Sequence, residues 1–84
     1  MTRILFFGRL QDIAGRAACE LDIPQHVSTI SDLRAWIAAE DDRLREALQA
    51  RDVRVVVDQV IRHNEAESVR GAGEIAFMPP VSGG

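Results

Sequence analysis

Residues 2–8 read Thr-Arg-Ile-Leu-Phe-Phe-Gly, an almost continuous apolar run with the length of one β-strand. β-Branched and aromatic residues favour a strand, and a run that does not alternate is typical of a strand covered on both faces. We therefore predict a strand at the centre of a sheet. Residues 10–14 have the length of a single helical turn, which Gly15 would end.

Residues 17–23 alternate acidic and apolar side chains, a pattern that predicts a half-exposed strand pairing back on the first. Further on, Thr29 and Asp32 have the spacing of a helix capping box. Ile30, Leu33 and Ile37 then fall on one helical stripe, with Trp36 beside it. This segment is predicted to be the main core helix.

A second helix is indicated where Asp41 and Asp42 precede an apolar stripe, because acidic side chains are stabilised by the helix dipole at a helix N-terminus. This helix would run to Ala50. Residues 53–57 form a β-branched run, and residues 60–61 either extend it or pair with it as a short hairpin. Residues 62–73 are polar and glycine-containing, so we expect a loop. Residues 74–78 form the last strand, which two prolines stop.

This order of strands and helices is typical of an α+β fold, a β-grasp roll in which a mixed sheet is packed on one face by the main helix. We expect one domain over residues 1–78 and a projecting tail over residues 79–84. Six residues reach at most about 20 Å when extended.

The chain of 84 residues carries a formal net charge of -3, which argues against nucleic acid as a partner. All ten basic residues are arginine, so the side chains offer no primary amine. The single Cys19 makes no internal disulfide. No cationic leader or long apolar run points to export or a membrane, and the cytoplasm is the expected location.

The tail combines a stiff base with a slim end. Pro79 and Pro80 restrict the backbone at its root, while Gly83 and Gly84 remove every side chain at its tip. Such an arm suits insertion into a narrow channel of another protein. The alternative is that the glycine pair has no function and is a frayed terminus or an expression remnant. Such a pair is expected by chance in only roughly one sequence in 200, which favours a functional tail.

A free carboxylate is a poor electrophile, so using the Gly84 carboxyl group requires an anhydride such as an acyl adenylate. The chain has no phosphate-binding loop, because Gly71-Ala72-Gly73 lacks a strand-to-helix context. We therefore expect no cofactor on this chain and an ATP-using partner enzyme. No paired acid and base and no Ser-His-Asp set indicates catalysis by the chain alone.

Three segments make the sequence resemble the small sulfur-carrier subunit of molybdopterin synthase: residues 4–7, the helix start at residues 29–37, and the C-terminal residues 77–84. The last segment, Phe-Met-Pro-Pro-Val-Ser-Gly-Gly, is the specific part. The resemblance covers essentially the whole chain. A Gly-Gly end alone is shared with the thiamin-pathway sulfur carrier and with ubiquitin-like modifiers.

The resemblance implies that an adenylating enzyme activates Gly84, that a sulfur donor protein converts it to a thiocarboxylate, and that Gly83 and Gly84 form the reactive end. Sulfur would then pass to a cyclic pyranopterin in the large synthase subunit, within a heterotetramer. The catalytic side chains would belong to that large subunit. Met78 stands where the family often has phenylalanine, and Asp58 where asparagine is common.

Strand alternation also predicts a docking surface. If Ile4 and Phe6 face the helix, Leu5 and Phe7 face away, and in the last strand Met78 does so too, with Ile75 and Phe77 inward and Ala76 outward. Phe7 and Met78 would form an exposed apolar patch beside the tail root. The residues we expect to bind the partner are Phe7, Met78, Pro79, Pro80, Val81 and Ser82.

Other candidate residues favour structural roles. Cys19 sits in a strand pattern and is expected to be a small buried residue rather than a sulfur carrier. His26 and His63 have no zinc-ligand spacing, so we expect no metal. The acids Glu40, Asp41 and Asp42 fit a solvated helix start. Arg62 and Arg70 either meet an acidic partner or lie in solvent.

Three other functions stay open at this level. The chain could carry sulfur for thiazole formation, although its Pro-Pro-Val root fits that pathway less well. It could be a protein modifier conjugated through Gly84 to lysines of targets. It could also be a plain binding module with an inert tail.

Overall fold

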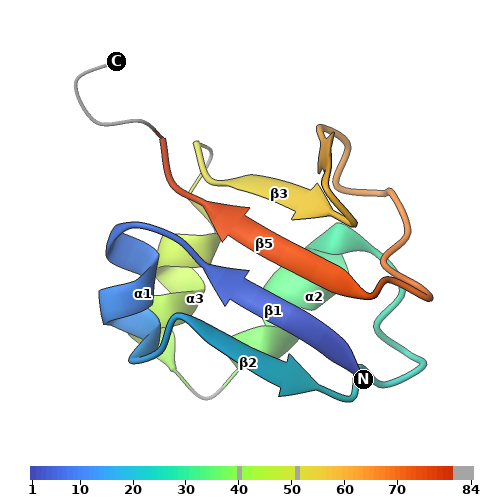
Figure 1. Cartoon of the computed structure of the whole chain (residues 1–84), viewed down its shortest axis with the longest axis horizontal. Coiled ribbons are helices and arrows are strands. Elements are labelled where there is room, and N and C mark those ends of the chain that lie inside the picture. The colour runs from blue at the N-terminus through green and yellow to red at the C-terminus, as the bar shows by residue number, and fades with distance from the viewer. Residues whose placement is uncertain (40, 51, 81–84) are drawn as a thin grey trace.

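The computed structural model describes residues 1–39, 41–50 and 52–80. Its strands are β1 (Thr2–Phe6), β2 (Ala18–Leu21), β3 (Arg54–Val57), β4 (Val60–Arg62) and β5 (Glu74–Met78), and its helices are α1 (Arg9–Ala14), α2 (Ile30–Ile37) and α3 (Asp42–Leu48). The strands form one sheet in the order β2-β1-β5-β3-β4, in which only β1 and β5 are parallel. Figure 1 shows α2 and α3 behind this sheet, and the expected α+β roll is confirmed.

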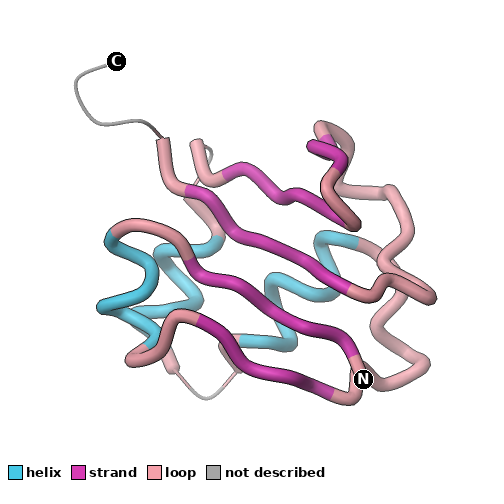
Figure 2. The backbone as a smooth tube through the Cα atoms, viewed as in Figure 1, coloured by secondary structure: helices cyan, strands magenta, loops and turns pink. Residues whose placement is uncertain are grey.

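The first strand differs from its prediction in two respects. β5, not β1, lies in the middle of the sheet, because it pairs with β1 on one side and β3 on the other (Figure 2). β1 is also covered on one face only: Ile4 and Phe6 are buried, whereas Arg3 is exposed and Leu5 is half-buried. The helices pack on a single face, so the apolar run of residues 2–8 does not reflect cover on both sides.

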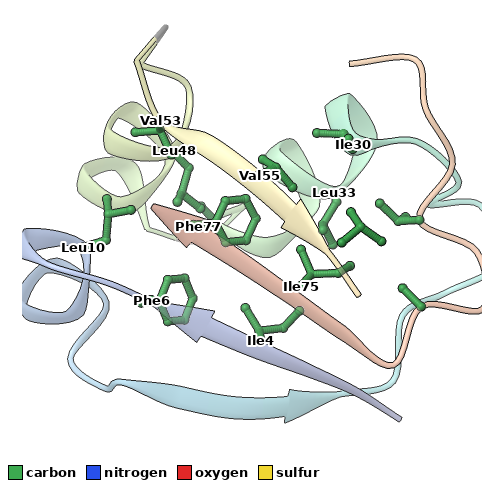
Figure 3. Close-up of a cluster of buried hydrophobic side chains, with 14 of the residues drawn as sticks. Ile4, Phe6, Leu10, Ile30, Leu33, Leu48, Val53, Val55, Ile75 and Phe77 are labelled. Carbon is green, nitrogen blue, oxygen red and sulfur yellow. The ribbon is translucent and has the colours of Figure 1, made fainter. Parts of the chain in front are cut away.

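The core lies between this covered face and the helices (Figure 3). Ile4, Ile75 and Phe77 are fully buried, and the rings of Phe6 and Phe77 stack with centroids 6.0 Å apart. Each fully buried side chain of this size contributes roughly 1.5–3 kcal/mol to folding. The inward positions predicted for Ile4, Phe6, Ile75 and Phe77 are thus confirmed.

The helix ends follow the capping signals in the sequence. Asp32 N donates to Thr29 Oγ1, and Thr29 N donates to the Asp32 carboxylate, so the capping box is formed. Asp41 caps α3 by accepting from Leu44 N at 3.1 Å. Gly15 closes α1 in the left-handed conformation, at φ 78°. The second predicted helix ends at Leu48, two residues earlier than expected.

Of the two alternatives for residues 60–61, the hairpin is correct: β4 pairs antiparallel with β3. The turn places Asp58 and Gln59 at φ 48° and 71°, as in a type I′ turn, which has positive φ at both central residues. Asp58 Oδ1 also accepts hydrogen bonds from Gly73 N at 2.9 Å and Glu74 N at 3.0 Å. The Asp58 side chain therefore ties the hairpin to the start of β5.

Arg34 joins three segments beneath the sheet. Its guanidinium donates to the carbonyl oxygens of Leu48 and Val53 and forms an ion pair with Glu65 at 2.8 Å. The arginine is almost fully buried. Because a buried charge needs partners, this network fixes α2 against the end of α3 and the loop before β5.

Candidate functional site

The tail root is held at the end of the sheet where β1 and β5 finish. Phe7, the residue after β1, donates its N–H to the carbonyl oxygen of Phe77 at 3.1 Å, at the last β1–β5 pair. Gly8 follows with φ 56°, and a Cβ there would lie 2.8 Å from Pro79 Cγ. The turn after β1 therefore packs closely on the first residue of the tail.

Phe7 and Met78 are exposed, as predicted, with 44% and 40% of their surfaces accessible. Ala76 faces outward from the sheet as expected, yet it is buried. It is a small residue in the central strand, paired with Leu5 on one side and Val56 on the other. Its larger neighbours cover it, and the outer face there is apolar.

The strand register extends this apolar character across the whole sheet. The outer row comprises Ala18, Leu5, Ala76, Val56 and Ile61, one residue from each strand. Ile61 is 49% exposed, while Leu5 and Val56 are half-buried. We call these five residues the outer row. The sequence analysis did not find it, because strand order and register depend on long-range pairing that no local pattern contains.

Two arginines flank the tail root. Arg54 pairs in register with Met78, and Arg9 begins α1 directly after Gly8. Both side chains are exposed. Although the whole chain is acidic, the residue that pairs with Met78 and the residue that follows Gly8 are thus both cationic. The sequence analysis missed both arginines, since their places beside the tail follow from the fold alone.

Four of the predicted site residues, Val81, Ser82, Gly83 and Gly84, lie outside the described residues. Pro79 is half-buried and Pro80 is exposed. The structure thus brings together Phe7, Met78 and the two prolines at one end of the sheet.

The remaining candidates have structural surroundings. Cys19 is half-buried in β2 and packs against the core, close to the expectation. Arg62 pairs with Glu67 at 3.1 Å, and Arg70 donates to Gln25 O at 2.8 Å, so both arginines bind within the chain. Residues 1–39, 41–50 and 52–80 contain no group of three potential metal ligands, His26 and His63 included.

Asp41 and Asp42 form the start of α3, as predicted, whereas Glu40 lies outside the described residues. No helix in the part of the chain that the structure describes is long and apolar enough to cross a membrane.

A mixed five-stranded sheet with helices on one face, and a tail leaving its central strand, defines the ubiquitin-like β-grasp class. Within that class the chain belongs to the ThiS family, whose model matches residues 4–84.

Similar proteins indicate which branch of the ThiS family the chain resembles. The molybdopterin synthase sulfur carrier subunit of Escherichia coli K12 is 34% identical, with 100% of both chains covered. The protein of the same name from Haemophilus influenzae Rd is 31% identical, again with 100% of both covered. Among solved structures, small archaeal modifier protein 1 of Haloferax volcanii superposes with a TM-score of 0.77 at 17% identity, covering 95% of this chain and 97% of that one. This last likeness supports the fold alone.

Proposed function

We propose that this chain is a sulfur carrier in the biosynthesis of molybdenum cofactor, and that it works through the carboxyl group of Gly84. The observation that carries the proposal is the end-to-end match to two relatives named molybdopterin synthase sulfur carrier subunit. The family match also reaches residue 84, so it includes the Gly-Gly end. A sulfur carrier of the thiamin pathway would use the same chemistry at Gly84. The experiment below distinguishes the two pathways.

The chemistry proceeds stepwise. An adenylating partner uses ATP to convert the Gly84 carboxylate to an acyl adenylate, with loss of pyrophosphate. A persulfide on a donor protein then displaces AMP to form an acyl disulfide. A thiol attacks the donor's sulfur in that disulfide, which releases the thiocarboxylate and leaves a disulfide on the donor. This thiocarboxylate donates its sulfur to a cyclic pyranopterin precursor bound by the large synthase subunit. Because activation consumes ATP, we expect the carrier to work in the cytoplasm and to bind no cofactor itself.

The large subunit and the adenylating enzyme both need to recognise the carrier near its tail. Phe7 and Met78 are exposed beside the tail root, and the outer row continues this apolar surface across the sheet. Exposed apolar area of this kind supports the proposal that the partners dock here. Arg9 and Arg54 add positive charge at its edge, which fits an acidic rim on the partner. Pro79 and Pro80, followed by Val81 and Ser82, would lead the reactive end into the partner's active site.

Genetic complementation tests the proposal. A strain that lacks this gene should lose the activity of its molybdenum enzymes and still grow without thiamin. The wild-type gene should restore the activity, and a gene lacking the codon for Gly84 should not. A thiamin requirement would instead assign the chain to thiazole formation. Full rescue by the shortened gene would contradict any role of the terminal carboxyl group.

A further inference from the structure

The cations of this chain share one chemical property: all ten are arginines, including Arg9 and Arg54 beside the tail root. Arginine and lysine supply the same charge, but the guanidinium stays protonated above pH 12 and is no nucleophile under ordinary conditions. A lysine amine attacks activated acyl groups and forms a stable amide. We propose that the arginine-only surface protects activated Gly84 from acylating its own carrier, an inference that rests on the proposed activation of this residue.

The position of Arg54 makes this protection matter. Its Cα pairs in register with that of Met78, in the neighbouring antiparallel strand. Paired Cα atoms in such strands are about 5 Å apart, and the six tail residues reach up to about 20 Å. An amine at position 54 would therefore lie well within the range of Gly84.

The remaining primary amine, at Met1, lies at the other end of the sheet. β1 and β5 run parallel, with Arg3 paired to Glu74, and Thr2 Oγ1 donates to Ala72 O at 2.9 Å. In Figure 1 the N-terminus accordingly lies opposite the arrowheads of β1 and β5. Six residues of strand separate Met78 from the level of Met1, about 20 Å in all. Gly84 would reach this amine only by extending the whole tail back along the sheet.

The reaction prevented is simple acyl transfer. A neutral amine attacks the Gly84 acyl carbon, the activating group leaves with its electron pair, and the nitrogen gives up one proton to water. Each such event would convert a carrier into a dead amide. A tail of this length holds the two groups at an effective concentration on the order of mM, about a hundred times that of a partner molecule at roughly 10 μM.

The test uses the full chain with a thioester made chemically at Gly84, so it needs no activating enzyme. Wild type, Arg54→Lys and Arg54→Gln are incubated at low concentration, and intact mass spectrometry measures the lactam, which weighs one water less than the hydrolysed chain. Arg54→Lys should form at least about ten times more lactam than the other two. Its rate should rise with pH, because only the neutral amine attacks.

Arg54→Gln is the matched control, since it removes the same guanidinium without adding an amine. Peptide mapping should place the new bond between Gly84 and the substituted side chain. Equal lactam in the lysine and glutamine variants would overturn the proposal, as would rapid capture of wild type by its own Met1 amine. Failure of the proposed function would show separately, as absence of activated Gly84 in cells, and would leave the thioester result unchanged.

Discussion

The amide of Phe7 donates a hydrogen bond to the carbonyl oxygen of Phe77 over 3.1 Å, which closes the β1–β5 ladder at its last pair, Phe6 with Phe77. This bond holds the exposed ring of Phe7 next to the strand that leads into the tail. The same end of the sheet presents Met78 and is flanked by Arg9 and Arg54. A partner that binds this surface would hold the tail root in a fixed position.

We predict that Phe7→Glu and Met78→Glu each weaken binding to the large synthase subunit at least about tenfold, the loss expected when a central apolar contact of an interface is replaced. Binding would be measured by isothermal titration calorimetry with the purified partner. Both side chains are exposed, so the variants should unfold at nearly the same temperature as wild type.

Val60→Glu is the matched control for these two variants. Val60 is 50% exposed, similar to Phe7, but lies on the edge strand β4 and pairs with the inward-facing Val57. Adding a charge there should leave affinity within about twofold of wild type, as is usual for a surface outside the energetic centre of an interface. Equal losses in all three variants would mean that the Phe7 and Met78 patch is not the docking surface.

The carboxylate of Asp58 should contribute to stability because it accepts hydrogen bonds from two backbone amides, Gly73 N and Glu74 N. We predict that Asp58→Ala lowers the free energy of unfolding by about 1–3 kcal/mol in urea denaturation. Asp58→Asn should retain most of the stability, since its amide oxygen accepts the same bonds and asparagine tolerates the φ of 48°. Asp58→Gly loses the same hydrogen bonds as Asp58→Ala but adopts the positive φ without strain. Its free energy of unfolding should therefore lie between those of Asp58→Ala and Asp58→Asn.

Arg34 provides a test of buried polar contacts. Arg34→Met keeps much of the packing but leaves the carbonyl oxygens of Leu48 and Val53 without this donor, and it should cost about 1–3 kcal/mol of unfolding free energy. Glu65 is half-exposed, so Glu65→Gln should cost less than about 1 kcal/mol. Urea denaturation compares the two. Equal destabilisation would show that the ion pair, not the carbonyl contacts, matters.

The capping box predicts a pH dependence. Hydrogen bonds from the amides of Ser28 and Thr29, and from the Ser28 hydroxyl, hold the pKa of Asp32 below its ordinary 3.8. A carboxyl group with a lowered folded pKa stabilises the fold above its unfolded pKa, and this stabilisation is lost as pH falls through the folded value. The unfolding free energy of wild type should therefore decrease below about pH 4.

Asp32→Asn should weaken that decrease, whereas Glu46→Gln, which alters an exposed acid on α3, should not. Thermal unfolding would be measured between about pH 2 and pH 6, in steps of roughly half a unit, because the loss falls below the unfolded pKa of an aspartate, about 3.9. An identical pH profile for wild type and Asp32→Asn would contradict the link to the capping box.

The sequence predicted most elements because their signals are local. Thr29 with Asp32, Asp41, and Gly15 each mark a helix end through neighbouring residues, and residues 74–78 match β5 to the residue. The hydrophobic pattern also identified Phe7 and Met78 as exposed. These signals depend on the same short-range sterics and hydrogen bonds in any fold.

What the sequence did not predict depends on long-range pairing. The apolar run of residues 2–8 suggested a central strand covered on both faces, but Leu5, which alternation had placed outward, belongs to a row on the sheet face opposite α2 and α3 (Figure 1). Only the register joins Leu5 to Val56 and Ile61 through Ala76. The partners of Arg34, at residues 48, 53 and 65, likewise cannot be predicted from local sequence, because only the fold brings them together.

The central claim is that Gly84 carries sulfur, and intact-mass spectrometry of the protein isolated from its own cells tests it most directly. A fraction of the chain should be heavier by the difference between one sulfur and one oxygen atom, with fragmentation placing the change at the C-terminal carboxyl group. Deleting Gly84 should abolish that fraction. A chain found only unmodified, or joined through Gly84 to lysines of other proteins, would contradict the sulfur-carrier assignment.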